Sequence, residues 1–175
     1  MTEILQTDRL IVRTFAKNDF RNFLSLNQDK ELMQYFDEGV KSLEKLRMRF
    51  NEIIEHQSKY DFSYYNFFLK DTNEYVGQGG CYYNFDMSIN VCYGFLKKFH
   101  GQGYASEAVG NVLKYEFSKR NFKEVVIRSA KENIASIKLA ERLGGVKFKE
   151  AKTLRGMEVV YFKIEKEILL KKYDK

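Results

Sequence analysis

The spacing of apolar residues changes from strand-like to helix-like early in the chain. Residues 9–15 alternate imperfectly between apolar and polar, and their β-branched content predicts a strand. A helix is predicted after Asp19. A second is predicted after Ser42, a suitable N-cap, because apolar residues then recur every three or four positions up to Ile54. Two helices therefore precede the main part of the sheet.

Strand-like runs dominate the middle of the chain. Three of them, 64–69, 75–85 and 89–96, are separated only by short segments of turn-forming residues at 71–73 and 86–88. Consecutive strands joined by such short turns pair with their neighbours in the sequence. The middle of the chain is therefore predicted to be an antiparallel meander.

Helices and strands alternate in the last part of the chain. Two helices are predicted at 104–120 and 134–143, and three strands at 125–129, 146–149 and 159–164. The strand before Gly101, the next helix and the next strand form a β-α-β unit with parallel strands. We therefore predict an α/β (α+β) fold, with a mixed central sheet of about six to seven strands flanked by about four helices. No linker, low-complexity tract or repeat divides the chain, so residues 1–175 are expected to form a single domain.

The composition is that of a folded, soluble protein. Of its 175 residues, 44% are hydrophobic and 15% aromatic, unlike the aromatic-poor composition of disordered chains. No apolar run approaches the roughly 18 to 20 residues that span a bilayer, and no signal peptide is recognisable, so we expect a cytoplasmic protein without a membrane partner. Cys81 and Cys92 are then expected to be reduced thiols in strands.

The chain is basic, with 30 Lys and Arg against 24 Asp and Glu and a formal net charge of +6. This charge would attract nucleic acid, an acidic lipid surface or a phosphorylated cofactor, and it is equally compatible with a solvated lysine-rich surface. Nucleic acid is disfavoured as a partner because the sequence has no zinc-ligand spacing, stacking motif or concentrated basic helix.

The segment 93–108 carries the most specific signal, because a strand there enters a helix through a short basic loop containing Gly101 and Gly103. The first N–H groups of a helix lack intrahelical partners and favour an anion, and glycine permits positive φ and close approach. A phosphate or pyrophosphate is the natural ligand, although a loop that merely turns the chain explains the same glycines. The dinucleotide fingerprint would need glycine at Ser106, and the P-loop would need Gly-Lys-Ser/Thr, so both classes are disfavoured.

Three stretches of the chain form a recognisable set of motifs: His100-Gly101-Gln102-Gly103-Tyr104-Ala105 with its continuation to Ala108, Asp8–Arg13, and Asn133–Gly144. They resemble motifs of the GNAT superfamily of acyl-CoA-dependent N-acyltransferases, in the branch similar to the RimJ/RimL N-terminal acetyltransferases of ribosomal proteins. The chain also departs from the pattern: His100 replaces Gln or Arg. Asn90 stands where the branch has Glu, and Cys92 and Gly145 replace the usual Gly and Phe.

The resemblance implies a sheet splayed in the middle and acetyl-CoA as the acyl donor, with its pyrophosphate on the N–H groups of Gly101 to Ala105. Its pantetheine arm would lie along the strand near Tyr93 to Leu96. The implied cofactor-binding residues are Phe95, Leu96, His100, Gly101, Gln102, Gly103, Tyr104, Ala105, Asn133 and Ser136, with no metal. The implied reaction is direct attack of a primary amine on the thioester, with the oxyanion held by a backbone N–H near the catalytic position Phe95.

Proton transfer requires a base for the amine and an acid for the leaving thiolate. Many relatives have a tyrosine acid seven residues after the helix Asn, where this chain has Ala140. In the resembling branch Ser136 can serve as the general acid, and Asn133 would contact the pantetheine arm. An N-cap and a first-turn residue would show the same spacing.

No base is singled out by the sequence. The candidates are Asp86, Glu74, Glu38 and His100, each of which is also explained as a surface or turn residue. His56 is expected to be a surface or hydrogen-bonded structural histidine. Three tyrosines of the predicted sheet either line an acceptor cleft or belong to the core: Tyr82, Tyr83 and Tyr93.

These features predict an N-acetyltransferase that moves an acetyl group from acetyl-CoA to a protein N-terminus or to a small polyamine or amino-sugar. Another acyl-CoA donor, or a non-catalytic acyl-CoA sensor, is the alternative, since Asn90 and Ala140 replace usual catalytic residues. Acceptor specificity is expected from the helices between positions 19 and 60 and from the loop around Asp86. The acidic pair Asp37-Glu38 could attract a cationic amine, although a solvated helix end explains the pair as well. The oligomeric state stays open, with a homodimer as the commonest soluble assembly.

Overall fold

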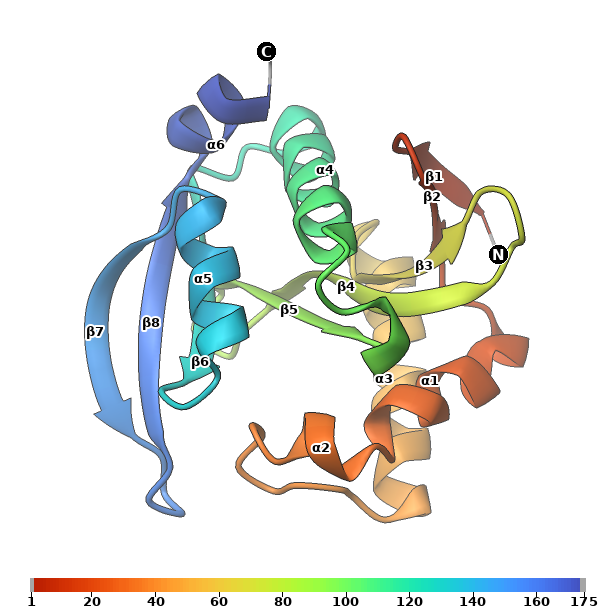
Figure 1. The fold of residues 1–175 in the computed structure, drawn as a ribbon, viewed down its shortest axis with the longest axis horizontal. Coiled ribbons are helices and arrows are strands. Elements are labelled where there is room, and N and C mark those ends of the chain that lie inside the picture. The colour runs from red at the N-terminus through yellow and green to blue at the C-terminus, as the bar shows by residue number, and fades with distance from the viewer. Residues whose placement is uncertain (1, 174–175) are drawn as a thin grey trace.

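The computed structural model describes residues 2–173, which form eight strands, six α-helices and two 3-10 helices (Figure 1). The strands are β1 (Glu3–Gln6), β2 (Leu10–Thr14), β3 (Tyr64–Leu69), β4 (Tyr75–Tyr83), β5 (Ile89–Phe95), β6 (Glu124–Ala130), β7 (Val146–Lys152) and β8 (Glu158–Glu165). The helices are α1 (Phe20–Asn27), α2 (Lys30–Met33), α3 (Leu43–Tyr60), α4 (Tyr104–Lys119), α5 (Ile134–Arg142) and α6 (Lys166–Tyr173), with 3-10 helices at Lys17–Asp19 and Lys97–Phe99.

All eight strands form one open sheet in the order β1-β2-β3-β4-β5-β6-β8-β7. Neighbouring strands are antiparallel except β5 and β6, which run parallel and are connected through α4. The predicted mixed sheet and β-α-β unit are confirmed. The strand count is one higher than the upper prediction because β1, a four-residue edge strand, is too short to show a readable alternation.

The sheet splays between its two parallel strands. Strands β5 and β6 share only two residue pairs, Asn90 with Val126 and Val91 with Ile127. Beyond Val91, β5 continues to Phe95 while paired only with β4. The splayed middle that the resemblance implied is therefore present, and it leaves one edge of β5 without a partner strand.

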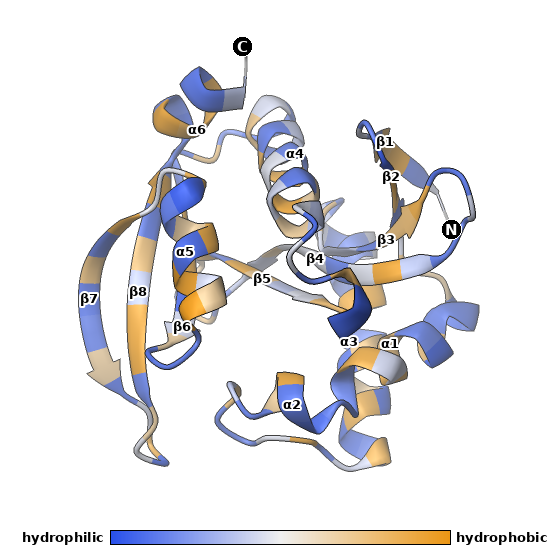
Figure 2. Ribbon diagram, in the orientation of Figure 1, coloured by the Kyte–Doolittle hydropathy of each residue, from blue (hydrophilic) through white to orange (hydrophobic). Residues whose placement is uncertain are grey.

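Helices cover both faces of the sheet, as the alternation along β3 shows. Tyr65 and Phe67 belong to the main core with residues of α4 and α5, whereas Tyr64 packs against the smaller cluster of α1 and α3 around Phe23 and Phe50. Successive side chains of a strand point to opposite faces, so α4 and α5 lie on one face and α1 and α3 on the other (Figure 1). Figure 2 shows both apolar and hydrophilic residues on the helices, as expected of helices that pack by one side.

Two helices were not predicted from the sequence, and a third extends beyond the periodic apolar residues that predicted it. The four-residue α2 is held by its N-cap Asp29, whose carboxylate accepts the N–H groups of Glu31 and Leu32. Helix α6 follows β8 directly and buries Leu169 against α4. Helix α3 begins after the predicted N-cap Ser42 and extends to Tyr60. A tertiary contact or a side-chain cap, rather than a long apolar period, decides these boundaries.

The remaining fold-level expectations concern cysteines and membranes. Cys81 is buried and Cys92 half-buried, and neither forms a disulfide. Burial raises the pKa of both thiols, which keeps them protonated. Among residues 2–173, no helix has the length and apolar character to cross a bilayer.

Candidate active site

The glycine turn forms an uncapped helix N-terminus. Gly101 and Gly103 have φ of 75° and 84°, in the left-handed region that glycine adopts without a Cβ penalty. Gly103 is the N-cap of α4 and offers no side chain to the first turn. Within residues 2–173, the backbone N–H groups of Tyr104, Ala105 and Ser106 therefore find no acceptor. Such donors, reinforced by the helix dipole, form an anion site.

The loop before this helix is fixed by side-chain hydrogen bonds to its own backbone. His100 Nε2 lies 2.8 Å from the carbonyl oxygen of Phe95, so this nitrogen must carry the hydrogen and donate it. The side-chain amide of Gln102 donates to the carbonyl of Lys98 at 2.8 Å. Both predicted contact residues therefore shape the loop instead of leaving their side-chain donors free.

Two lysines beside the loop are engaged in exposed ion pairs. Lys97 pairs with Glu31 and Lys98 with Glu74, and all four side chains are largely exposed. Exposed pairs of this kind contribute little to stability. The positive character of the turn therefore comes chiefly from the backbone N–H groups and only secondarily from these lysines.

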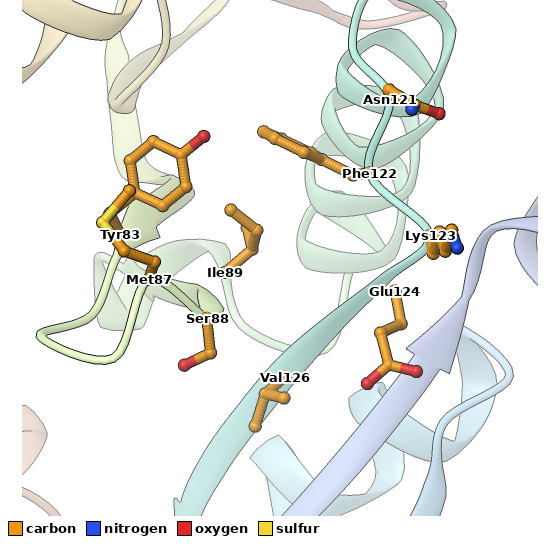
Figure 3. Close-up of a pocket in the computed structure, with 9 residues that line it drawn as sticks. All are labelled: Tyr83, Met87, Ser88, Ile89, Asn121, Phe122, Lys123, Glu124 and Val126. Carbon is orange, nitrogen blue, oxygen red and sulfur yellow. The ribbon is translucent and has the colours of Figure 1, made fainter.

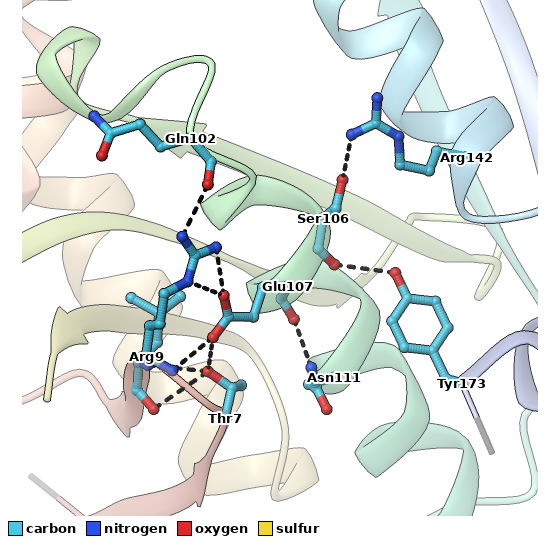
Figure 4. A network of polar contacts seen from close by, with 9 residues as sticks. Thr7, Arg9, Gln102, Ser106, Glu107, Asn111, Arg142 and Tyr173 are labelled. Carbon is cyan, nitrogen blue, oxygen red and sulfur yellow. Dashed lines mark hydrogen bonds and ion pairs between the residues drawn. The ribbon is translucent and has the colours of Figure 1, made fainter. Parts of the chain in front are cut away.

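A half-buried carboxylate ties the start of α4 to the turn between β1 and β2 (Figure 4). One oxygen of Glu107 accepts from Thr7 Oγ1 at 2.5 Å and from the Arg9 N–H at 2.8 Å, and the other accepts from Arg9 Nε at 2.7 Å. Burial raises the pKa of Glu107, but the hydrogen bonds from Thr7 and Arg9 outweigh it and hold the pKa below its ordinary value. The same guanidinium donates to the carbonyl of Gln102 at 2.9 Å and lies 4.2 Å from the ring centre of Tyr104.

The Arg9–Glu107 contact was not predicted from the individual residues. Both residues lie in the stretches on which the family resemblance rests, so the resemblance was the one available signal. Their role is structural: the contact fixes the two sides of the glycine turn relative to the sheet. A second fastening comes from α5 and α6, where Arg142 donates to Ser106 Oγ at 3.0 Å and Tyr173 to the Ser106 carbonyl at 3.1 Å (Figure 4).

Replacing Glu107 with alanine is expected to lower the free energy of unfolding by about 2 kcal/mol, because it removes a charged acceptor and leaves Arg9 unpaired. Urea unfolding followed by circular dichroism measures this change. Glu31→Ala is the matched control, since it removes an exposed partner of Lys97 and should cost less than about 0.5 kcal/mol. Equal losses in the two variants would contradict the role assigned to Glu107.

Beyond Val91, the edge of β5 that has no partner strand directs its backbone groups into the opening between β5 and β6. The N–H of Leu96 donates to Val76 O in β4 at 2.9 Å. Backbone groups alternate between the two edges of a strand, so the N–H of Phe95 points the other way, toward β6. Pairing with β6 has ended at Val91, so no strand meets this N–H. Phe95 thus offers a backbone donor at the position expected for an oxyanion.

The N-terminus of α5 faces the same opening. Asn133 is the N-cap of this helix, and its side-chain oxygen accepts the N–H of Ser136 at 3.1 Å. The simple capping interpretation of this pair therefore holds, and it leaves the Ser136 hydroxyl free for a tertiary contact. That contact is with Tyr93 of β5, whose hydroxyl lies 3.0 Å from Ser136 Oγ. Ala140, at the position of the missing tyrosine, is fully buried.

A cleft of about 470 Å³ adjoins the end of β6 and the start of α5. Its walls come from the segment after α2, the β6–α5 turn and the β7–β8 turn, and its charged lining residues are Asp37, Lys131, Glu132, Arg155 and Glu158. Asp37 accepts a hydrogen bond from Thr153 at 2.5 Å, and Glu38 pairs with Arg155. The predicted acidic pair therefore joins the helical segment to the β7–β8 turn beside this cleft.

A second cavity, of about 300 Å³, lies at the start of β5, at the end of this strand away from Phe95 (Figure 3). It is lined by residues of the β4–β5 turn and of the segment that enters β6, among them Met87, Ile89 and Phe122. Asp86 belongs to the same turn, where its carboxylate accepts from Ser88. The length of β5, about 20 Å, separates this end from Phe95. Asp86 is therefore remote from the glycine turn.

The other proton-transfer candidates are engaged elsewhere. Glu74 and Glu38 form the ion pairs with Lys98 and Arg155 described above. His56 is buried; its Nδ1 donates to Phe62 O at 2.8 Å, and its Nε2 accepts the Tyr83 N–H at 3.2 Å. Burial lowers the pKa of His56, so it is a neutral structural histidine, the second of the two alternatives that the sequence left open. No group of His, Cys, Asp and Glu in residues 2–173 is arranged to hold a metal ion.

The fold and this geometry define a class of protein: an α/β domain whose splayed mixed sheet meets an uncapped, glycine-led helix. Residues 9–146 match the family model described as the acetyltransferase (GNAT) domain. This chain therefore belongs to the GNAT acetyltransferase family.

Individual relatives agree with this assignment. An uncharacterized N-acetyltransferase of Bacillus subtilis, YnaD, is 26% identical over 142 residues, which are 80% of this chain and 81% of the relative. The Vibrio cholerae spermidine N-acetyltransferase in complex with CoA and spermine is 22% identical, with a TM-score of 0.74 over 92% of this chain and 98% of that chain. RimL, a ribosomal alpha-N-protein acetyltransferase in complex with coenzyme A, is 19% identical, with a TM-score of 0.78 over 94% and 98%. At these identities the two solved structures show the fold, and RimL is consistent with the predicted RimJ/RimL-type branch.

Proposed function

We propose that this protein transfers an acetyl group from acetyl-CoA to a primary amine, with both substrates bound in one ternary complex. The observation that carries the proposal is the uncapped N-terminus of α4, where the N–H groups of Tyr104, Ala105 and Ser106 face no acceptor within residues 2–173. A pyrophosphate satisfies these donors and the helix dipole together. The CoA bound in the Vibrio cholerae spermidine N-acetyltransferase and in RimL supports the same ligand.

In this proposal the chain contacts acetyl-CoA along two elements. Gly101 to Ala105 hold the pyrophosphate, and the free edge of β5 borders the pantetheine arm at Phe95 and Leu96. His100 and Gln102 contribute by fixing the loop through their backbone hydrogen bonds. Asn133 and Ser136 border the pantetheine arm from the start of α5.

The chemistry proposed is a direct acyl transfer. The lone pair of the amine attacks the thioester carbonyl carbon, and the N–H of Phe95 stabilises the negative charge that develops on the carbonyl oxygen. The C–S bond then breaks, and the sulfur leaves with the electron pair while accepting a hydrogen bond from the Ser136 hydroxyl. The proton lost by the amine balances the thiolate, so the products are an amide and a thiol.

The acceptor is proposed to enter through the cleft beside α5. The cleft has carboxylates at Asp37, Glu132 and Glu158 and cations at Lys131 and Arg155. This mixed lining is compatible with a protein N-terminus and with a small polyamine or amino-sugar. Each of these acceptor classes is therefore tested separately in the experiment below.

The test is a calorimetric titration of the native protein with acetyl-CoA, followed by thiol release in the presence of spermine, an amino-sugar and peptides with free N-termini. Matched peptides with blocked N-termini are the control. We expect saturable binding and release of thiol with at least one free amine. Binding without turnover on any amine would instead support the acyl-CoA sensor, and absence of binding would refute both.

A further inference from the structure

The contact between Tyr93 and Ser136 spans the opening between β5 and β6, beyond their last residue pair. Tyr93 lies on β5 two residues beyond the last pair with β6, and Ser136 lies in the first turn of α5, which packs on β6 and β8. The Tyr93 hydroxyl is 3.0 Å from Ser136 Oγ and 3.3 Å from the Ser136 carbonyl oxygen. It thus reaches from the edge that carries Phe95 to the hydroxyl proposed to meet the leaving sulfur.

A tyrosine hydroxyl has one hydrogen, so the two contacts define two arrangements. In the first, Tyr93 donates to the Ser136 carbonyl and accepts the Ser136 hydroxyl hydrogen. In the second, Tyr93 donates to Ser136 Oγ, and the serine hydrogen is free to point at another acceptor. The carbonyl keeps a partner in both, since the N–H of Ala140 lies opposite it in α5. The exchange therefore leaves no backbone group unsatisfied.

We infer that Tyr93 is a positioning residue, which turns the Ser136 hydroxyl hydrogen toward the sulfur of coenzyme A by donating its own hydrogen to Ser136 Oγ. The inference rests on the proposed function, because the acceptor of the serine hydrogen is the thiolate that acyl transfer releases. A donor that is itself hydrogen-bonded by a second hydroxyl is polarised and binds an anion more strongly.

The surroundings of Tyr93 keep it a donor. Burial raises its pKa to about 12, despite the opposing effect of the Ser136 hydrogen bond, so the phenol stays protonated at neutral pH. The neighbouring Cys92 is also kept protonated by burial, which raises its pKa. The hydroxyl pair therefore operates without a change in its own charge.

The experiment measures the pKa of the thiol of coenzyme A bound to the native protein and to variants. The rate of alkylation by iodoacetamide is followed between about pH 6 and 9.5, around the ordinary thiol pKa of about 8.5. Mass spectrometry of the CoA adduct separates this reaction from any alkylation of Cys81 or Cys92. No amine is needed, so the result does not depend on knowing the acceptor.

We expect the thiol pKa of CoA to be lower in the native complex than in free CoA. In the Tyr93→Phe complex, the thiol pKa should be about one unit higher than in the native complex. Ser136→Ala should raise it at least as far, and the double variant no further than Ser136→Ala, because Tyr93 acts through Ser136. Tyr161→Phe is the control: Tyr161 is half-buried on β8, and its hydroxyl has no hydrogen bond within residues 2–173.

An unchanged thiol pKa in Tyr93→Phe, with CoA still bound, would overturn the inference and leave Tyr93 a simple tether between β5 and α5. Additive shifts in the double variant would also overturn it, since Tyr93 would then act independently of Ser136. Failure of the native protein to bind CoA would instead refute the proposed function. Thermal unfolding of each variant shows whether the fold is intact.

Discussion

A Gly103→Trp variant is expected to lose acetyl-CoA binding by at least about 100-fold, equivalent to about 2.7 kcal/mol. Two effects act together at this position. Gly103 has φ of 84°, which a residue with a Cβ adopts only with strain. An indole attached to the N-cap would also lie against the first turn of α4, where the free N–H groups of Ala105 and Ser106 would otherwise meet the pyrophosphate.

Calorimetric titration measures this loss, and circular dichroism checks the fold. Gly39→Trp is the matched control, because Gly39 also has a positive φ, 59°, and an added Cβ there meets no atom within 4 Å. Both variants place the same bulky side chain on a residue with positive φ, but only one lies at the glycine turn. Native-like affinity in a folded Gly103→Trp protein would place the cofactor elsewhere.

The second large effect is a pH dependence of stability caused by Glu116. This side chain is fully buried in α4, accepts a short hydrogen bond from the Tyr65 hydroxyl and lies 2.8 Å from Arg120 Nη1. Burial is the largest influence and raises the pKa of Glu116 from 4.5 to about 7, while Tyr65 and Arg120 oppose the rise and the carboxylate of Asp61 adds to it.

The sign of the effect follows from proton binding. The pKa of Glu116 is higher in the folded protein than in the unfolded chain, so the folded protein binds more protons between these two values. The contribution of Glu116 to the free energy of unfolding is therefore fully present below about pH 4.5 and is lost as the pH rises to about 7. Between pH 5 and 8, the loss attributable to Glu116 is about 2.5 kcal/mol.

Urea unfolding of the native protein and of Glu116→Gln at these two pH values isolates the contribution of this group. Glutamine has nearly the same shape and does not titrate, so the native protein should lose about 2.5 kcal/mol more than the variant between pH 5 and 8. The difference cancels the titration of all groups that the two proteins share. An equal loss in both would show that Glu116 titrates with an ordinary pKa.

The sequence predicted the elements whose causes are local. Ser42 begins α3 because a serine side chain caps the helix that follows, and the runs of β3, β4 and β5 were readable from alternation and turn residues. Helices α2 and α6 were missed since neither has a long apolar period. Asp29 caps the first, and packing on α4 determines the second.

The candidate site also combines features with local causes and features that depend on tertiary packing. The free N–H groups at the start of α4 follow from a strand, two glycines and a helix in succession, and these are neighbours along the chain. The bridge from Tyr93 to Ser136 and the contact of Arg9 with Glu107 join residues 43 and 98 positions apart. No local preference specifies such pairs. They form only when β2, β5, α4 and α5 are packed around one sheet, because the burial of apolar side chains between these elements fixes where their polar groups meet.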